Sequence, residues 1–229
     1  KAYPEILYGK NPYGSIPSTT SDFPRRISTL GEIAVTYKAS IQTTGQTNDY
    51  NLSFDLWITD SNTPTPQNIK LEIMVWELGT FEPGIAGFTL PHETVTVDGY
   101  SYELYSFVHS SLSFQYRAFL PRFTPNVANR TIRLDPFIAF LRTRGDLTND
   151  QFLSNITFGT ELVQGSGSIT LADYTINLTQ PVSTQTLTLS GINWICYSHK
   201  TNQYVNPASG VFESVSEGLK IFGTDYRRG

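Results

Sequence analysis

The 229-residue sequence is poor in charge, in cysteine and in long apolar runs. Charged side chains make up only 16% of it, and the formal net charge is −4. Its single cysteine, Cys196, excludes an internal disulfide. No run of about 20 apolar residues occurs, so we expect no membrane-spanning helix. What remains is rich in hydroxyl, amide and tyrosine side chains, a composition typical of a β protein whose polar face meets uncharged, hydroxyl-rich ligands.

The shortage of charge and of metal ligands also narrows the function. Phosphate binding needs a basic patch, and the most basic cluster here lies at the chain ends, so we expect no nucleic-acid partner. The three histidines, His92, His109 and His199, are isolated and lack metal-ligand spacing. We therefore expect neither a metal site nor a cofactor.

Two stretches carry the same unusual alternation. In residues 71–76, Leu-Glu-Ile-Met-Val-Trp, the apolar residues point one way and Glu72, Met74 and Trp76 point the other. Residues 51–59 repeat the pattern, with Asp55 and Trp57 opposite an apolar face. A carboxylate among large apolar groups on a strand is typical of a cleft floor that performs acid–base or nucleophilic chemistry. An ordinary strand with a solvated acid is the alternative interpretation.

The remaining periodicity predicts about a dozen strands, with loops at 44–49, 77–91 and 165–167. The single helix is predicted over 135–142, with Asp135 as its N-cap and Gly145 at its end. These elements predict an all-β fold, a jelly-roll-like sandwich of two curved antiparallel sheets with one helix packed outside. We expect residues 1–229 to form a single domain, with an open groove that suits a polymer.

Carboxylates are the remaining candidates for catalytic groups. No Gly-x-Ser-x-Gly elbow is present, and residues 165–168, Gly-Ser-Gly-Ser, precede a strand rather than the helix that a phosphate loop requires. Glu161 ends a Phe-Gly-Thr-Glu strand on its polar side. Together with Glu72 and Asp55 it supplies the carboxylate pair that glycoside hydrolysis needs.

Aromatic and amide side chains complete the expected sugar site, because sugar rings pack on aromatic faces. For any single one of these side chains, a purely structural role at the edge of the core is about as good an interpretation as sugar binding. The predicted substrate-binding residues are Asn11, Tyr13, Trp57, Met74, Trp76 and Trp194.

These motifs resemble family 12 of the glycoside hydrolases. Glu72 matches the nucleophile of that family's Glu-x-Met-x-Trp strand, Glu161 matches its acid/base in Phe-Gly-Thr-Glu, and Asp55 matches the Asp that supports the nucleophile. Residues 81–87 resemble the family's loop called the cord, and residues 3–13 resemble a Tyr-Pro-Glu-Ile segment of prokaryotic members. The resemblance covers about residues 3–178.

The resemblance implies a retaining endo-β-1,4-glucanase. Glu72 would attack the anomeric carbon, while Glu161 would protonate the leaving oxygen and then activate water. Such chemistry requires carboxyl groups about 5–5.5 Å apart. Two alternatives stay open: a xyloglucan- or mixed-linkage-glucan-specific hydrolase, and a non-catalytic carbohydrate-binding jelly roll. Four N-glycosylation sequons, at Asn51, Asn129, Asn155 and Asn177, lead us to expect a secreted, extracellular protein, and we expect it to be a monomer.

The chain departs from the family in the order of its segments. The Tyr-Pro-Glu segment normally follows about two strands, but here it opens the chain, and some fifty residues follow the family's usual last strand. We therefore predict a circular permutation in which residues 185–229 supply the family's first strands, with Trp194 matching loosely its Asn-x-Trp motif. A plain C-terminal extension is the rival account.

Overall fold

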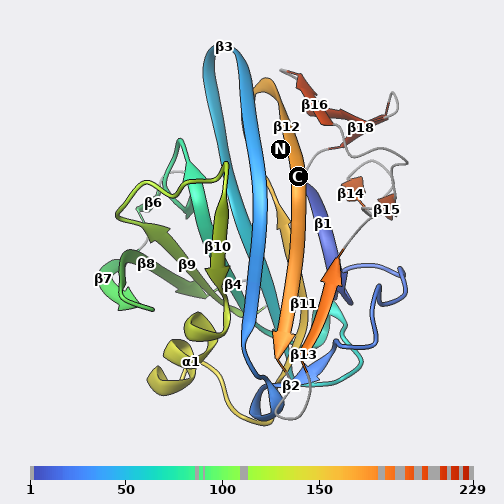
Figure 1. The fold of residues 1–229 in the computed structure, drawn as a ribbon, viewed down its shortest axis with the longest axis vertical. Coiled ribbons are helices and arrows are strands. Elements are labelled where there is room, and N and C mark those ends of the chain that lie inside the picture. Colours follow the sequence, from blue (N-terminus) through green and yellow to red (C-terminus); the bar gives the residue numbers. More distant parts are fainter. Residues whose placement is uncertain are drawn as a thin grey trace.

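Twenty-seven consecutive residues, Ile33–Thr59, form a single strand, β3, that joins both layers of the molecule. This computed structural model describes residues 3–85, 88–89, 91–108 and 113–179, and the backbone of strands β13–β18 beyond them. In Figure 1, β3 rises along the front, arches over at the top and descends behind. Residues 44–49, predicted as a loop, thus lie within the strand.

The inner layer is a sheet of nine strands with the order β7-β8-β9-β4-β3-β11-β1-β14-β15. All of its pairs are antiparallel except β4 and β9, which run parallel. The fold prediction of antiparallel sheets therefore holds with this one exception. The nine strands of the inner sheet are, besides β3, β7 (His92–Val97), β8 (Tyr100–Val108), β9 (Gln115–Pro121), β4 (Ile69–Gly79), β11 (Phe152–Gly159), β1 (Pro4–Gly9), β14 (Trp194–Ser198) and β15 (Gln203–Val205).

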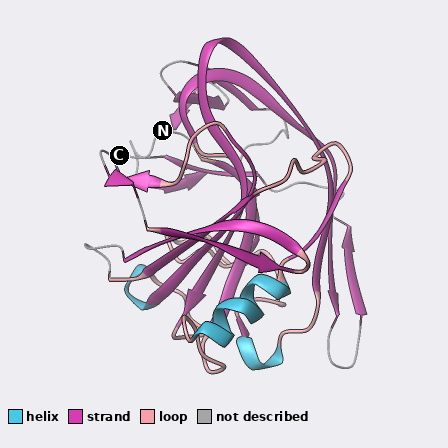
Figure 2. Ribbon diagram, turned by 90° about the vertical axis from the view of Figure 1, so that its left-hand side faces the viewer, coloured by secondary structure: helices cyan, strands magenta, loops and turns pink. Residues whose placement is uncertain are grey.

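The outer layer is built on the first arm of β3 and on β12 (Leu162–Thr179), and Figure 2 shows the two layers from the side. Residues 165–167, expected as a loop, form part of β12, where Gly165 has a φ of 108° and the pairing with β3 shifts register. The other members of this layer are β10 (Arg130–Arg133), β13 (Thr184–Thr188), β16 (Phe212–Val215), β17 (Gly218–Ile221) and β18 (Thr224–Tyr226).

Short elements complete the described structure. Strand β2 (Arg25–Arg26) pairs with the start of β11, and β5 (Gly84–Ile85) pairs with β6 (Phe88–Thr89). Two 3₁₀ helices, η1 (Ile27–Thr29) and η2 (Pro66–Asn68), lie in the loops. The predicted Asp98-Gly99 turn between β7 and β8 is confirmed, because both residues have the positive φ that such a turn needs.

The core lies between the two layers, and the sequence alternation predicted which residues enter it. In the inner layer the apolar faces of the second arm of β3, of β4 and of β11 are buried there, and they face those of the first arm of β3 and of β12 in the outer layer. Representative members are Val35, Phe54, Ile73, Phe158 and Ile176.

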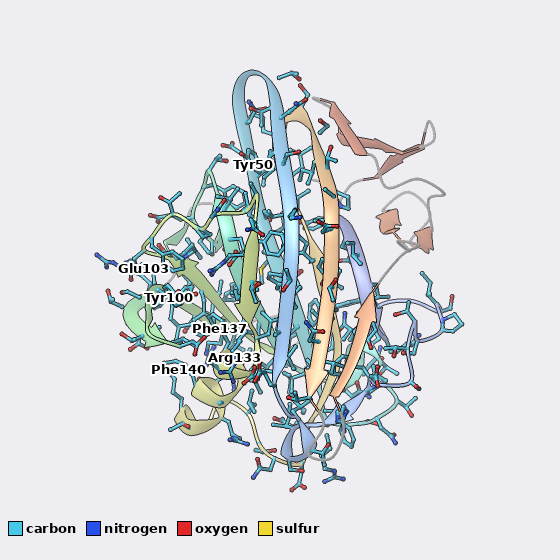
Figure 3. The ribbon with its side chains drawn as sticks, viewed as in Figure 1. Tyr50, Tyr100, Glu103, Arg133, Phe137 and Phe140 are labelled. Carbon is cyan, nitrogen blue, oxygen red and sulfur yellow. The ribbon has the colours of Figure 1, made fainter. Side chains whose placement is uncertain are left out.

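The helix α1 (Asp135–Arg144) extends the outer layer. Its Phe137, labelled in Figure 3, packs its ring edge-on against the rings of Tyr102 and Phe119 on β8 and β9. Gly145 ends the helix in the left-handed conformation, as predicted. Asp135, however, is not the N-cap. Its carboxylate accepts hydrogen bonds from the backbone N–H of Ile33, at 2.9 Å, and from Arg133, so it ties the helix to β3.

Glu77 is a buried carboxylate within this core. The sequence placed it at the start of a loop, but β4 continues through it to Gly79, and its side chain is fully buried. Its Oε2 accepts hydrogen bonds from the Tyr37 hydroxyl at 2.6 Å and from Arg130 Nε at 2.8 Å. Burial, and then the Glu77 carboxylate, raise the pKa of Tyr37 well above its usual value, so the phenol stays protonated.

Candidate active site

The concave face of the inner sheet presents three successive rows of side chains. Strand pairing aligns residues of β1, β11, β3 and β4, and the alternation directs every second residue away from the core. From one end to the other, the rows are Glu5-Gly159-Ser53-Trp76, Leu7-Thr157-Asp55-Met74 and Gly9-Asn155-Trp57-Glu72.

Asp55 and Glu72 lie on neighbouring strands of this face. Asp55 is opposite Met74 and Glu72 is opposite Trp57, so the two acids are diagonal neighbours, about 7–8 Å apart at the backbone. Glu72 is 6% exposed, whereas Asp55 is half-buried. The strand pattern that predicted both acids on one face is thus reproduced in three dimensions.

Glu161 follows the end of β11 and is held by Asn51 of β3. The Asn51 side chain accepts a hydrogen bond from the Glu161 backbone N–H at 2.7 Å and donates one to Glu161 Oε2 at 2.9 Å. The Asn51 backbone N–H in turn donates to the Glu161 carbonyl at 3.1 Å. Asn51 is fully buried, so this carboxylate is attached to a rigid part of the sheet. Sequence reasoning missed Asn51, although it stands four residues before Asp55 on the same face.

One pocket brings Glu161 and Asp55 together. Both line it, with Ser53 and Thr157 between them, and Glu5 of β1 lines it as well. The pocket therefore joins carboxylates from three strands on the face that also carries Glu72. Sequence reasoning missed Glu5, because it lies in a segment where only the aromatic and amide residues stood out.

The predicted substrate-binding residues Trp57, Met74 and Trp76 are 5%, 2% and 1% exposed. Trp57 lies between the rings of Tyr13 and Phe114, at centroid distances of 5.2 and 5.6 Å. Met74 Sδ accepts a hydrogen bond from the Tyr116 hydroxyl at 2.9 Å. These three side chains are about as little exposed as Glu72, which lies on the same face, and their contact with a sugar stays a prediction.

Asn11 and Tyr13 lie in the loop after β1. Asn11 is buried, and its side chain accepts a hydrogen bond from the Tyr13 backbone N–H at 2.8 Å and donates one to Glu5 Oε1 at 3.4 Å. Tyr13 is half-buried against Trp57. For Trp194 the backbone pairs with Ile6 in β1, while its side chain is outside the described residues.

Among the side chains that the structure describes, all of which lie between residues 3 and 179, no group of three or more His, Cys, Asp or Glu could hold a metal ion. No helix in the same part of the chain is long and apolar enough to cross a membrane.

A comparison with protein families decides the relationship that the motifs suggested. Residues 1–179 match the model of glycosyl hydrolase family 12. The chain belongs to this family. The resemblance drawn from Glu72, Glu161 and Asp55 is thereby confirmed for the family, and these family 12 motifs occupy neighbouring strands of one face.

Curated relatives of this family 12 chain have a consistent type of name. It is 29% identical over 158 residues to "Probable xyloglucan-specific endo-beta-1,4-glucanase A" of Aspergillus clavatus, covering 68% of this chain and 62% of that protein. It is 24% identical over 181 residues to "Endoglucanase S" of Pectobacterium parmentieri, covering 78% and 66%. The chain thus spans about three-fifths to two-thirds of the length of these relatives.

Solved structures of family 12 proteins share the fold. The xyloglucanase from Bacillus licheniformis matches with a TM-score of 0.65 and 24% identity, covering 78% of this chain and 75% of that one. "Endoglucanase cel12A from Rhodothermus marinus" matches with a TM-score of 0.63 and 21% identity, covering 81% and 75%. The predicted all-β, jelly-roll-like sandwich is therefore confirmed.

Proposed function

We propose that this family 12 protein is a retaining endo-β-1,4-glucanase that cleaves internal bonds of cellulose or related β-glucans. The observation that carries the proposal is the gathering of Asp55, Glu72 and Glu161 on one concave face. Each acid comes from a different one of three neighbouring strands, β3, β4 and the end of β11. A non-catalytic binding module would need aromatic side chains but not these carboxylates.

In the proposed mechanism, Glu72 attacks the anomeric carbon and forms a covalent glycosyl intermediate. Glu161 protonates the departing glycosidic oxygen and then takes a proton from the water that releases the sugar. Asp55, diagonal to Glu72, orients the nucleophile. We expect the carboxyl groups of Glu72 and Glu161 to lie about 5–5.5 Å apart in the substrate complex.

The first test replaces each catalytic acid by its amide. Glu72→Gln removes the nucleophile, so release of reducing ends from soluble β-glucan should fall below detection. Glu161→Gln removes acid and base catalysis, which contributes roughly 10²–10⁴-fold. On an aryl glycoside whose leaving group needs no proton it should still release the aryl group in an initial burst, while turnover stays slow because the second step lacks its base. Glu93→Gln on β7, exposed and outside the cleft, is the matched control. Full activity of either variant on glucan would remove that residue from the mechanism.

Xyloglucan is the second candidate substrate, favoured by the names of the Aspergillus and Bacillus relatives. The two candidates differ in the branches along the glucan backbone, and the width of the groove decides between them. A panel of unbranched cellulose, mixed-linkage glucan and xyloglucan, compared by kcat/KM, separates the candidates. A preference of tenfold or more for xyloglucan would replace the first candidate by the second.

We further propose that the protein acts outside the cell as a monomer on its polysaccharide. The support is the size of the substrate, since the enzyme has to reach an insoluble or very long glucan outside the cell. Activity in the culture fluid of the source organism is the result expected for the location, and elution of the purified 229-residue chain at its own mass of 25.6 kDa is the result expected for the monomer. Activity confined to the cells would contradict the location, and a doubled mass would contradict the monomer.

A further inference from the structure

Glu5 of β1 is an acid of the concave face that the catalytic roles above do not use. Its chain neighbour Ile6 belongs to the core, so the alternation directs Glu5 to the opposite side, toward the cleft. It is half-buried and lines the pocket that Asp55 and Glu161 also line. At about 4.8 Å per strand spacing, β1 lies about 10 Å from β3 at the backbone. Glu5 and Asp55 therefore face one pocket from the two strands that flank β11.

Gly159 keeps the space between these two acids open. It is paired with Glu5 on one side and with Ser53 on the other. A Cβ at this position would lie 2.1 Å from the carbonyl oxygen of Pro4 and 2.7 Å from the Cα of Glu5. No side chain larger than hydrogen fits, so nothing from β11 stands between Glu5 and the centre of the pocket in this row.

Asn11 holds the Glu5 carboxylate from the side of the loop after β1. The Asn11 amide donates to Glu5 Oε1 at 3.4 Å, and its oxygen accepts from the backbone N–H of Tyr13 at 2.8 Å. Glu5 is thereby attached to the loop that packs against Trp57. An ionised carboxylate has about four acceptor positions, so it can bind several donors at once.

We propose that Glu5 is a substrate-binding residue that accepts hydrogen bonds from the hydroxyl groups of a neutral sugar unit beside the point of cleavage. This inference rests on the proposed glucanase function and names the feature of the substrate that the site recognises. A carboxylate suits hydroxyl donors because it only accepts. Beside Asp55 and Glu161 it also disfavours any polymer that carries its own negative charge at this position.

The test measures binding apart from catalysis. In the Glu161→Gln protein, calorimetry gives the Kd of cellotetraose, a neutral unbranched oligomer, with and without Glu5→Ala. Loss of hydrogen bonds to a charged acceptor should raise Kd about tenfold or more. Glu5→Gln keeps the shape and one acceptor, so its Kd should fall between the two. Glu93→Gln in the same background is the control and should change Kd less than twofold.

A Kd within twofold of the parent for both Glu5 variants overturns the proposal. Thermal unfolding of each variant shows that the fold survives, and if Glu5→Ala does not fold, Glu5→Gln decides alone. The result is separable from the proposed function. Wild-type protein that binds cellotetraose through Glu5 but cleaves no β-glucan would refute hydrolysis alone. Full cleavage with unaltered binding in the Glu5 variants would refute the role of Glu5 alone.

Discussion

At the scale of single residues, the arrangement around Glu161 depends on Asn51. An acid catalyst has to meet the leaving oxygen at hydrogen-bond distance, and Glu161 stands just past the end of its strand, where one backbone hydrogen bond from Asn51 holds it. The Asn51 side chain adds two more bonds, one to the backbone and one to the carboxylate of Glu161. Asn51 is thus a positioning residue.

We predict that Asn51→Ala lowers kcat on β-glucan by roughly 10²-fold with little change in KM, because a displacement of about 1 Å costs that much. The deficit should shrink on an aryl glycoside whose leaving group needs no proton, since Glu161 is then not required as an acid. Asn129→Ala, an exposed asparagine on the β9–β10 loop, is the control. An equal loss on both substrates would indicate a merely structural role.

At the scale of elements, strand β10 is joined to β4 through the core by one buried ion pair. Arg130 of β10 is paired with Glu77 of β4, and their side chains are 13% and 0% exposed. The guanidinium also lies 5.6 Å from the centre of the Phe123 ring. Removing one partner of such a pair leaves a buried charge without compensation, which costs more than the pair itself contributes.

Arg130→Met should therefore destabilise the protein by about 3–5 kcal/mol, because Glu77 would remain charged in the core. Arg122→Met is the control. Arg122 pairs with Glu103 at the surface, and the Arg122 side chain is 51% exposed. Glu103 is labelled in Figure 3. An exposed pair contributes about 0–1 kcal/mol. Denaturant unfolding measures both, and similar losses for the two variants would contradict the account.

At the scale of the whole molecule, strands from the C-terminal part are paired within both layers. Strand β14 pairs with β1, with Glu5 opposite Ile195, and β16 pairs with β12, with Ser168 opposite Glu213. The family match, in contrast, ends at residue 179. We propose that residues 1–229 form a single domain in which residues 185–229 take the place of the family's first strands. The two pairings support this proposal.

A chain that ends at Thr179 tests the proposal. It would expose the edges of β1 and β12, and unpaired edges promote aggregation. We expect this variant to be insoluble or to lose cooperative thermal unfolding, and β-glucan cleavage with it. A soluble, fully active variant with an unchanged Tm would show that the C-terminal strands are an appendage, as the rival account holds.

The sequence alone determined the faces of the strands. Period-two alternation assigned Phe54, Ile73 and Phe158 to the core and Asp55 and Glu72 to the opposite side, because each strand must bury one face. It also predicted the helix end at Gly145 and the family, since both depend on short local patterns. The prediction from sequence failed at residues 44–49 and 165–167, where strands continue through polar residues. No local pattern in the sequence shows that two paired strands continue through a shared bend.

Tertiary structure decided which residues meet across strands. Three contacts join residues at least 50 positions apart in the chain: Asn51 with Glu161, Glu5 with the pocket of Asp55, and Arg130 with Glu77. Register and the packing of neighbouring side chains set these relations. Both arise only when the sheet has formed, because alternation along one strand says which way a side chain points but not what it meets.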